Sequence, residues 1–116
     1  MDLPTRNTRT RESRRHFRIR YPLRLRPRLE VEGVSAAVID VSEGGIRIVY
    51  QKGMPLLPGD AVACEVKFCC GDGATLSGNV IRVTEQDVAF SLARGISFSI
   101  IVREQRALRT RQRYPV

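Results

Sequence analysis

Two arginines spaced four residues apart, Arg14 and Arg18, stand in a segment that has no acidic residue from Ser13 to Leu29. A third arginine, Arg15, lies between them. A guanidinium presents a planar set of donors that binds phosphate oxygens in pairs, or the O6 and N7 edge of guanine. The segment therefore predicts a site for an anion: a nucleic acid backbone, an anionic membrane or a small phosphorylated ligand.

A second group of polar residues lies at the end of a predicted strand, in the order Asp40, Ser42, Gly44 and Gly45. The carboxylate is an acceptor suited to the N1–H and N2–H2 edge of guanine, Ser42 adds a hydroxyl, and the glycines let a ligand approach the backbone. Together with the arginines, these residues favour a guanine nucleotide. Each segment alone has a simpler explanation, because arginines four apart are common and Asp and Ser often stabilise turns.

The rest of the chain shows no arrangement typical of catalysis or of metal binding. The single histidine, His16, lies among arginines, and the glycine-rich phosphate-binding sequences of nucleotide enzymes are missing. The cysteines Cys64, Cys69 and Cys70 lack zinc-site spacing and are expected to be reduced thiols of a cytoplasmic protein. No apolar run approaches the length that spans a membrane. We expect a protein that is not an enzyme, needs no metal or cofactor and does not insert into membranes.

The net charge of +8 is distributed unevenly along the chain. Residues 1–28 contain ten arginines against Asp2 and Glu12, and residues 103–116 contain five against Glu104, whereas residues 29–102 carry more acidic than basic groups. This pattern indicates an acidic body with basic ends. Residues 1–13 are expected to form a flexible arm or linker, because they contain almost no apolar side chains to bury.

Alternation of apolar and polar residues predicts short strands with no helix between them, which is typical of an antiparallel barrel or sandwich. In the first strand, arginines 24, 26 and 28 would occupy the exposed face. Prolines and glycines predict a loop at 52–60. The expected strands are 23–32, 34–40, 45–50, 61–68, 74–83 and 87–92.

The C-terminal part shows a different period. Apolar side chains between Phe98 and Leu108 recur at three- and four-residue spacing, and Ser97 is a suitable N-cap. The arginines of this segment gather toward its C-terminal end, where they favour the helix dipole. We expect one amphipathic helix at about 98–112 that lies on the barrel, with its arginines on the solvated face.

The order and spacing of the two polar segments resemble those of the PilZ domain family. R-x-x-x-R at Arg14 and Arg18 is followed by [DN]-x-S-x-x-G at Asp40, Ser42 and Gly45, and a PGD turn at 58–60 precedes a strand. The resemblance covers about residues 13–112. It implies an all-β, six-stranded antiparallel barrel at about 19–92 and a C-terminal α-helix at about 97–112, in a domain spanning 14–112.

The resemblance also implies a function, the binding of cyclic di-GMP in bacterial second-messenger signalling. Arg14 and Arg18 would contact guanine and phosphate, and Asp40, Ser42 and Gly45 would lie on the guanine edge. To these motif residues we add Arg15, inside the first motif, and Arg47, which points away from the core beside the glycine turn. One departure is expected: the glycine that the family carries in G-[hydrophobic]-x-F before the final helix is replaced in the stretch 89–92.

The leading interpretation is a receptor or adaptor module. Cyclic di-GMP would order the arginine-rich N-terminal segment and thereby change the affinity for an effector protein or a fused domain. A general nucleic-acid-binding barrel is the first alternative, and it is disfavoured because only Phe17 and Tyr21 could stack on bases near the arginines. A PilZ-like interaction domain without ligand is the second. Membrane association through the arginine-rich ends lacks an apolar anchor.

Overall fold

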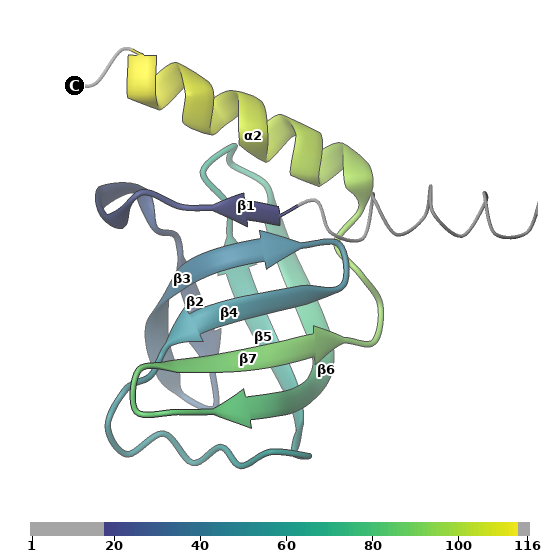
Figure 1. Ribbon diagram of the computed structural model, residues 1–116. Helices are drawn as coiled ribbons and strands as arrows, with labels where there is room; N and C mark the ends of the chain where they lie inside the picture. Colours follow the sequence, from purple (N-terminus) through teal and green to yellow (C-terminus); the bar gives the residue numbers. More distant parts are fainter. Residues whose placement is uncertain (1–17, 114–116) are drawn as a thin grey trace, which may run out of the picture.

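The computed structural model describes residues 18–113, which form a closed antiparallel barrel with one helix across its end (Figure 1). The expected arm at 1–13, Arg14 and Arg15 lie outside the described residues. The strands follow one another in the sheet as β1-β3-β2-β5-β6-β7-β4, and pairing of β3 with β4 closes the barrel. The elements are β1 (Arg18–Arg20), η1 (Leu23–Leu25), β2 (Arg28–Val31), β3 (Val34–Ser42), β4 (Gly45–Val49), β5 (Ala61–Lys67), β6 (Gly73–Val83), β7 (Asp87–Leu92) and α2 (Phe98–Arg113).

The sequence prediction of a six-stranded antiparallel barrel with a C-terminal helix is confirmed, and one short strand is added. The added strand, β1, pairs with residues 40–42 of β3, while β2 pairs with residues 34–37 of the same strand. The two short strands thus share one edge of β3. This arrangement places the arginines of β1 beside the polar end of β3.

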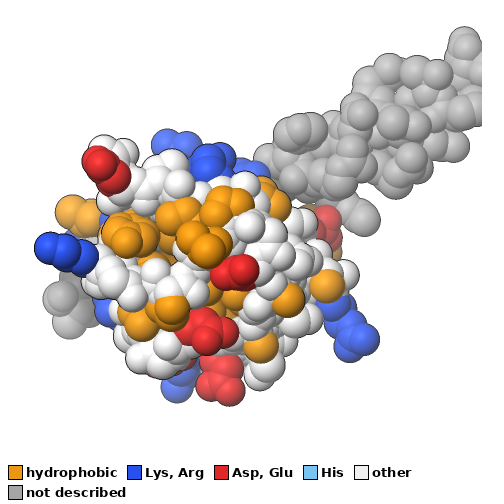
Figure 2. All heavy atoms as spheres, turned by 90° about the horizontal axis from the view of Figure 1, so that it is seen from below, with side chains coloured by type: hydrophobic (Ala, Val, Ile, Leu, Met, Phe, Trp, Pro, Cys, Tyr) orange, Lys and Arg blue, Asp and Glu red, His pale blue; other side chains and the backbone are white. Residues whose placement is uncertain are grey.

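The barrel interior follows from the period of two in its strands. Along β5, every second side chain is buried and the others are exposed. The loop between β4 and β5 contributes Met54 and Leu56 to the same core. At the barrel end away from α2, apolar side chains reach the surface with acidic ones among them (Figure 2), and Leu57 of this loop is 68% exposed.

The strand expected at 23–32 is partly wrong. Residues 23–25 form the 3-10 turn η1, in which Leu23 is 77% exposed, and the strand begins only at Arg28. Pro22 and Pro27 flank the turn, and a proline has no N–H to donate to a strand neighbour. As a further correction, Arg26 is not on an exposed strand face: it is half-buried, and its Nε has no hydrogen-bond partner in the described part of the chain.

Helix α2 is fastened to the barrel end by a buried carboxylate. Glu104 is 0% exposed and accepts hydrogen bonds from the Tyr21 hydroxyl (2.6 Å) and from the backbone N–H groups of Cys69 (2.9 Å) and Cys70 (2.8 Å). Burial, together with the neighbouring carboxylate, raises the pKa of Tyr21 far above its usual value. The helix therefore contacts both the turn between β5 and β6 and the residue that follows β1. No helix among residues 18–113 is long and apolar enough to cross a membrane.

The buried thiol of Cys64 gives the fold an alkaline limit. Burial raises its pKa from 9.0 to about 11 in the folded protein, where the residue is 2% exposed. Above pH 9 the unfolded chain therefore releases this proton while the folded chain keeps it, so stability falls as the pH rises toward 11. We expect this thiol to remove about 2–3 kcal/mol over that range. Urea unfolding at several pH values should show a shallower decline for Cys64→Ala; an unchanged slope would contradict the assignment.

Candidate functional site

The outer face of the sheet around β3 and β4 carries two rows of side chains that face the same way. We call the first the arginine row, since arginines stand at its ends and centre; the second, the small-residue row, holds short side chains beside Arg18. Strand register places their members side by side. The arginine row is Arg20, Asp40, Arg47, Ala89 and Arg82, and the small-residue row is Arg18, Ser42, Gly45 and Ser91.

Between the two rows, the same strands turn apolar side chains inward. This core row is Ile19, Val41, Ile46, Phe90 and Val80. Because side chains alternate between faces along a strand, the core row fixes the direction of the residues on either side of it. The site is therefore positioned by the packing of the barrel itself.

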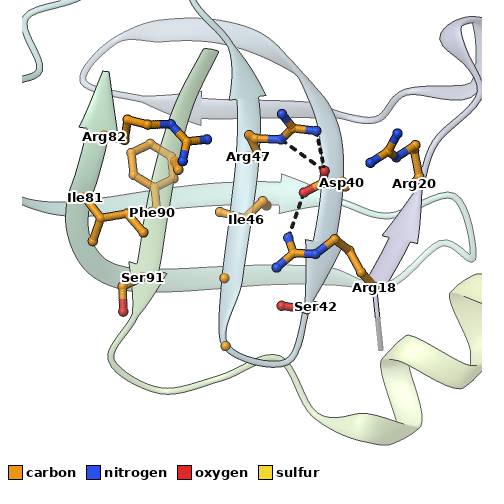
Figure 3. Close-up of a pocket in the computed structure, with 13 residues that line it drawn as sticks. Arg18, Arg20, Asp40, Ser42, Ile46, Arg47, Ile81, Arg82, Phe90 and Ser91 are labelled. Carbon is orange, nitrogen blue, oxygen red and sulfur yellow. Dashed lines mark hydrogen bonds and ion pairs between the residues drawn. The ribbon is translucent and has the colours of Figure 1, made fainter. Parts of the chain in front are cut away.

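The two rows line an open groove of about 620 Å³ (Figure 3). At Gly45 the groove floor is bare backbone. A Cβ added there would lie 3.1 Å from the carbonyl oxygen of Phe90. Arg18 and Arg20 stand on one side of this floor and Arg82 on the other. The groove thus offers room over small residues between arginine walls, which suits a flat polar ligand with negative charge.

A buried carboxylate holds two of the arginines in place. Asp40 is 1% exposed; its Oδ1 accepts from Arg18 NH1 at 3.0 Å, and its Oδ2 accepts from Nε (3.0 Å) and NH2 (2.7 Å) of Arg47. Arg47 also donates through NH1 to Asp87 at 3.0 Å. The hydrogen bond to Asp40 raises the pKa of Arg47. Burial opposes ionisation of Asp87, but hydrogen bonds from Thr84 and Arg47 outweigh it and lower the pKa of that carboxyl.

Five of the seven residues proposed from the sequence meet in this groove. Arg18, Asp40, Ser42, Gly45 and Arg47 all line it. Arg14 and Arg15 lie outside the described residues, so their place relative to the groove stays a prediction. Contact between the five residues and a ligand is likewise a prediction.

The groove also contains residues that the sequence reasoning missed. Arg20 could have been found, because it is two residues after Arg18 and a strand places both on one face. Arg82 could not, since it is exposed directly after the exposed Ile81 only through an irregularity of β6 between Val80 and Arg82. Such a bulge turns two consecutive side chains outward and has no dependable sequence signal.

The turn beside the groove is tied to the segment that leads into α2. The carbonyl of Glu43 accepts from Ile96 N (2.9 Å), and that of Gly44 accepts from Leu92 N (3.0 Å). A Cβ at Gly95 would collide with the carbonyl oxygen of Glu43. A glycine is therefore required where the chain passes the turn, and the turn and the start of α2 form one packed unit.

Comparison with known families assigns the chain. The model of the PilZ domain matches residues 12–112. The chain belongs to the PilZ domain family. PilZ domains are cyclic di-GMP-binding adaptors, and as a class they are ligand receptors. No curated protein matches the sequence.

Two solved structures resemble this PilZ domain in fold. The inhibitor of motility MotI/DgrA of Bacillus subtilis gives a TM-score of 0.61 at 12% identity, over 84% of this chain and 50% of that one. An uncharacterised Legionella protein, Lpg0364, gives 0.50 at 13% identity, over 84% and 92% of the two chains. This chain thus spans about half the length of the Bacillus protein's chain, and at such identity the likeness concerns the fold.

The family's glycine before the final helix is present, contrary to the expectation placed on residues 89–92. The sequence Gly95-Ile96-Ser97-Phe98 fits G-[hydrophobic]-x-F and leads directly into α2. The collision that a Cβ at Gly95 would cause explains why this PilZ domain keeps the glycine. The earlier assignment was wrong because it placed the motif in β7, one segment too early.

Proposed function

We propose that this chain binds cyclic di-GMP in the groove of the two outer rows and acts as a receptor module without catalytic activity. The observation that carries the proposal is the buried Asp40 clamped between Arg18 and Arg47, at the meeting point of the two sequence motifs. It brings the two motif segments, 22 residues apart in the chain, into direct contact. The proposal is supported by membership of the PilZ family.

The charge of the groove matches the proposed ligand. Four arginines face two carboxylates in and beside the groove, which leaves an excess of two positive charges. A cyclic dinucleotide carries one negative charge on each of its two phosphates. The balancing groups are Arg18, Arg20, Arg47 and Arg82 against Asp40 and Asp87.

The ligand-free geometry suggests how guanine recognition would proceed. The side chain of Arg18 is 46% exposed, so it is able to leave Asp40 and donate to the ligand, together with Arg14 and Arg15. Oδ1 of Asp40 is then free to accept from the N1–H and N2–H2 edge of guanine. The exchange keeps the buried carboxylate satisfied throughout, which matters because an unpaired buried charge is strongly destabilising. Ser42 and the backbone at Gly45 complete the contacts on the floor.

The proposed output is a change at the arginine-rich segment before β1, read by an effector protein or a fused domain. MotI/DgrA, a protein of similar fold, is an inhibitor of motility. An adaptor role toward another protein is consistent with that likeness.

Calorimetric titration of the whole chain with cyclic di-GMP tests the proposal, with GTP and cyclic di-AMP as controls. We expect saturable binding of cyclic di-GMP and much weaker binding of both controls. Adenine N1 is an acceptor and cannot donate to Asp40, and GTP offers one guanine edge where cyclic di-GMP offers two. Single-stranded RNA that competes at equal concentration would contradict the proposal, and would indicate a site for polyanions in general.

Two adjacent glycines provide a matched pair of variants for the groove floor. Gly45→Ala adds a methyl group on the floor, whereas a Cβ at Gly44 meets nothing within 4 Å. We expect Gly45→Ala to weaken cyclic di-GMP binding about fivefold or more, roughly 1 kcal/mol, and Gly44→Ala, in the turn at the edge of the groove, to weaken it less. Affinities and melting temperatures of both variants check this; equal affinities would show that the ligand does not lie over β4.

A further inference from the structure

We infer that Arg20, which belongs to neither sequence motif, is the arginine that receives a phosphate of the ligand, and that Arg47 is a clamp of the groove floor. The inference rests on the proposed function and assigns roles within that site. It replaces the sequence-based expectation that Arg47 contacts the ligand.

All three nitrogens of the Arg47 guanidinium already donate to a carboxylate. Nε and NH2 donate to Oδ2 of Asp40 at 3.0 and 2.7 Å, and NH1 donates to Oδ2 of Asp87 at 3.0 Å. The side chain is 28% exposed, while those of its two partners are 2% and 13% exposed. A phosphate at Arg47 would have to share the guanidinium with Asp40 and Asp87, which already accept from all three of its nitrogens. Its position therefore fits a residue that joins β3, β4 and β7.

Arg20 is in the opposite situation. It is exposed, lines the groove, and stands in register with Asp40 on the neighbouring strand. Within residues 18–113 its side chain has no hydrogen bond or ion pair, and Figure 3 shows it beside Asp40 without a dashed line. The other groove arginines share their charge: Arg18 with Asp40 at 3.0 Å, and Arg82 with Asp87 at 3.7 Å. Among these four, Arg20 alone has no carboxylate partner within residues 18–113.

An unpaired guanidinium is the most favourable phosphate partner in such a groove. It can form two parallel, charge-assisted hydrogen bonds to phosphate oxygens. A phosphate at Arg20 has no competing carboxylate partner among residues 18–113, whereas at the other groove arginines it competes with one. An ordinary solvated arginine would also be unpaired, so position distinguishes Arg20. Arg24 is also exposed and its side chain has no partner in the described residues, but it lies on η1 outside the groove.

The test compares Arg20→Ala, Arg24→Ala and Arg47→Ala in cyclic di-GMP titrations at low and high salt, with the melting temperature of each variant. We expect Arg20→Ala to weaken binding roughly tenfold at low salt and to keep the wild-type melting temperature. The difference from the wild type should narrow at about 1 M salt, where the screening length is only about 3 Å. Arg24→Ala should bind within about twofold of the wild type.

Arg47→Ala should instead lower the melting temperature by roughly 10 °C, because Asp40 and Asp87 each lose a partner. Arg47→Lys keeps the charge and should recover part of this loss. Arg20→Lys should bind between the wild type and Arg20→Ala, since lysine keeps the charge and loses the paired donors.

The outcomes separate this inference from the proposed function. If the wild type binds cyclic di-GMP and Arg20→Ala binds it with the same affinity, the inference is overturned and the proposed function stands. A loss in Arg24→Ala as large as that in Arg20→Ala also overturns it, because total charge would then explain both. If Arg47→Ala binds cyclic di-GMP weakly and keeps the wild-type melting temperature, the assignment of Arg47 as a clamp is overturned. Absence of wild-type binding overturns the proposed function and the inference together.

Discussion

Replacing Arg18 by alanine is expected to weaken cyclic di-GMP binding roughly ten- to a hundredfold, the loss of about 1.5–3 kcal/mol for a charge-assisted contact. Arg18 is the one motif arginine within the described residues, and its NH1 lies 3.0 Å from Oδ1 of Asp40 at the edge of the groove. Its removal deletes a ligand donor and also leaves Asp40 with Arg47 as its remaining cation. Arg14→Ala is expected to have an effect of similar size.

Calorimetry against a suitable control decides whether the position of Arg18 matters. Arg26 is unsuitable as this control, because it is half-buried in the turn after η1. Arg28 is better: it is exposed on β2 and donates to Ser35 at 3.1 Å, away from the groove. Equal losses for Arg18→Ala and Arg28→Ala would mean that the arginines act only through their summed charge.

Replacing Glu104 by alanine is expected to lower the free energy of unfolding by about 3 kcal/mol or more. The carboxylate satisfies three donors at once, the Tyr21 hydroxyl and the N–H groups of Cys69 and Cys70. Each donor left without a partner in a buried place costs about 1–3 kcal/mol. A loss of this size is a large part of the stability of a small domain, about 5–15 kcal/mol in total.

Urea unfolding of three variants checks this prediction. Tyr21→Phe removes one of the three hydrogen bonds and should cost about 1–1.5 kcal/mol. Arg109→Ala, on the exposed face of the same helix, should change stability by less than about 0.5 kcal/mol. If Glu104→Ala behaves like Arg109→Ala, then the helix is held by its apolar contacts and the buried carboxylate contributes little.

Most strands of the barrel could be predicted from the sequence because one face of each is buried and the other is not. That rule holds along β5 from Ala61 to Lys67 without exception. It failed between Leu23 and Arg28, where leucine and arginine also alternate. There two prolines break the strand, and the 3-10 turn leaves Leu23 exposed. The pattern alone cannot tell these two cases apart.

The site was predictable to the extent that its residues are close together in the chain. Asp40 and Ser42 lie at the end of β3 and Gly45 is the first residue of β4, so their spacing indicated a common face. Arg82 reaches the groove through a bulge in a strand far along the chain, and Glu104 meets its partners 34, 35 and 83 residues away. Such contacts depend on the closed barrel, which no local pattern encodes.

The placement of the core row between the two outer rows has a consequence for how such a domain can evolve. A substitution at an outer position, such as Ala89 or Ser91, alters the groove and leaves the interior as it was. Deletion of a single residue within β4 would reverse the direction of every following side chain in that strand, turning Arg47 inward and Ile48 outward. Ligand preference is thus free to drift by point changes. A change of length must instead fall in a loop, such as that at 50–60, or be absorbed by a bulge such as that of β6.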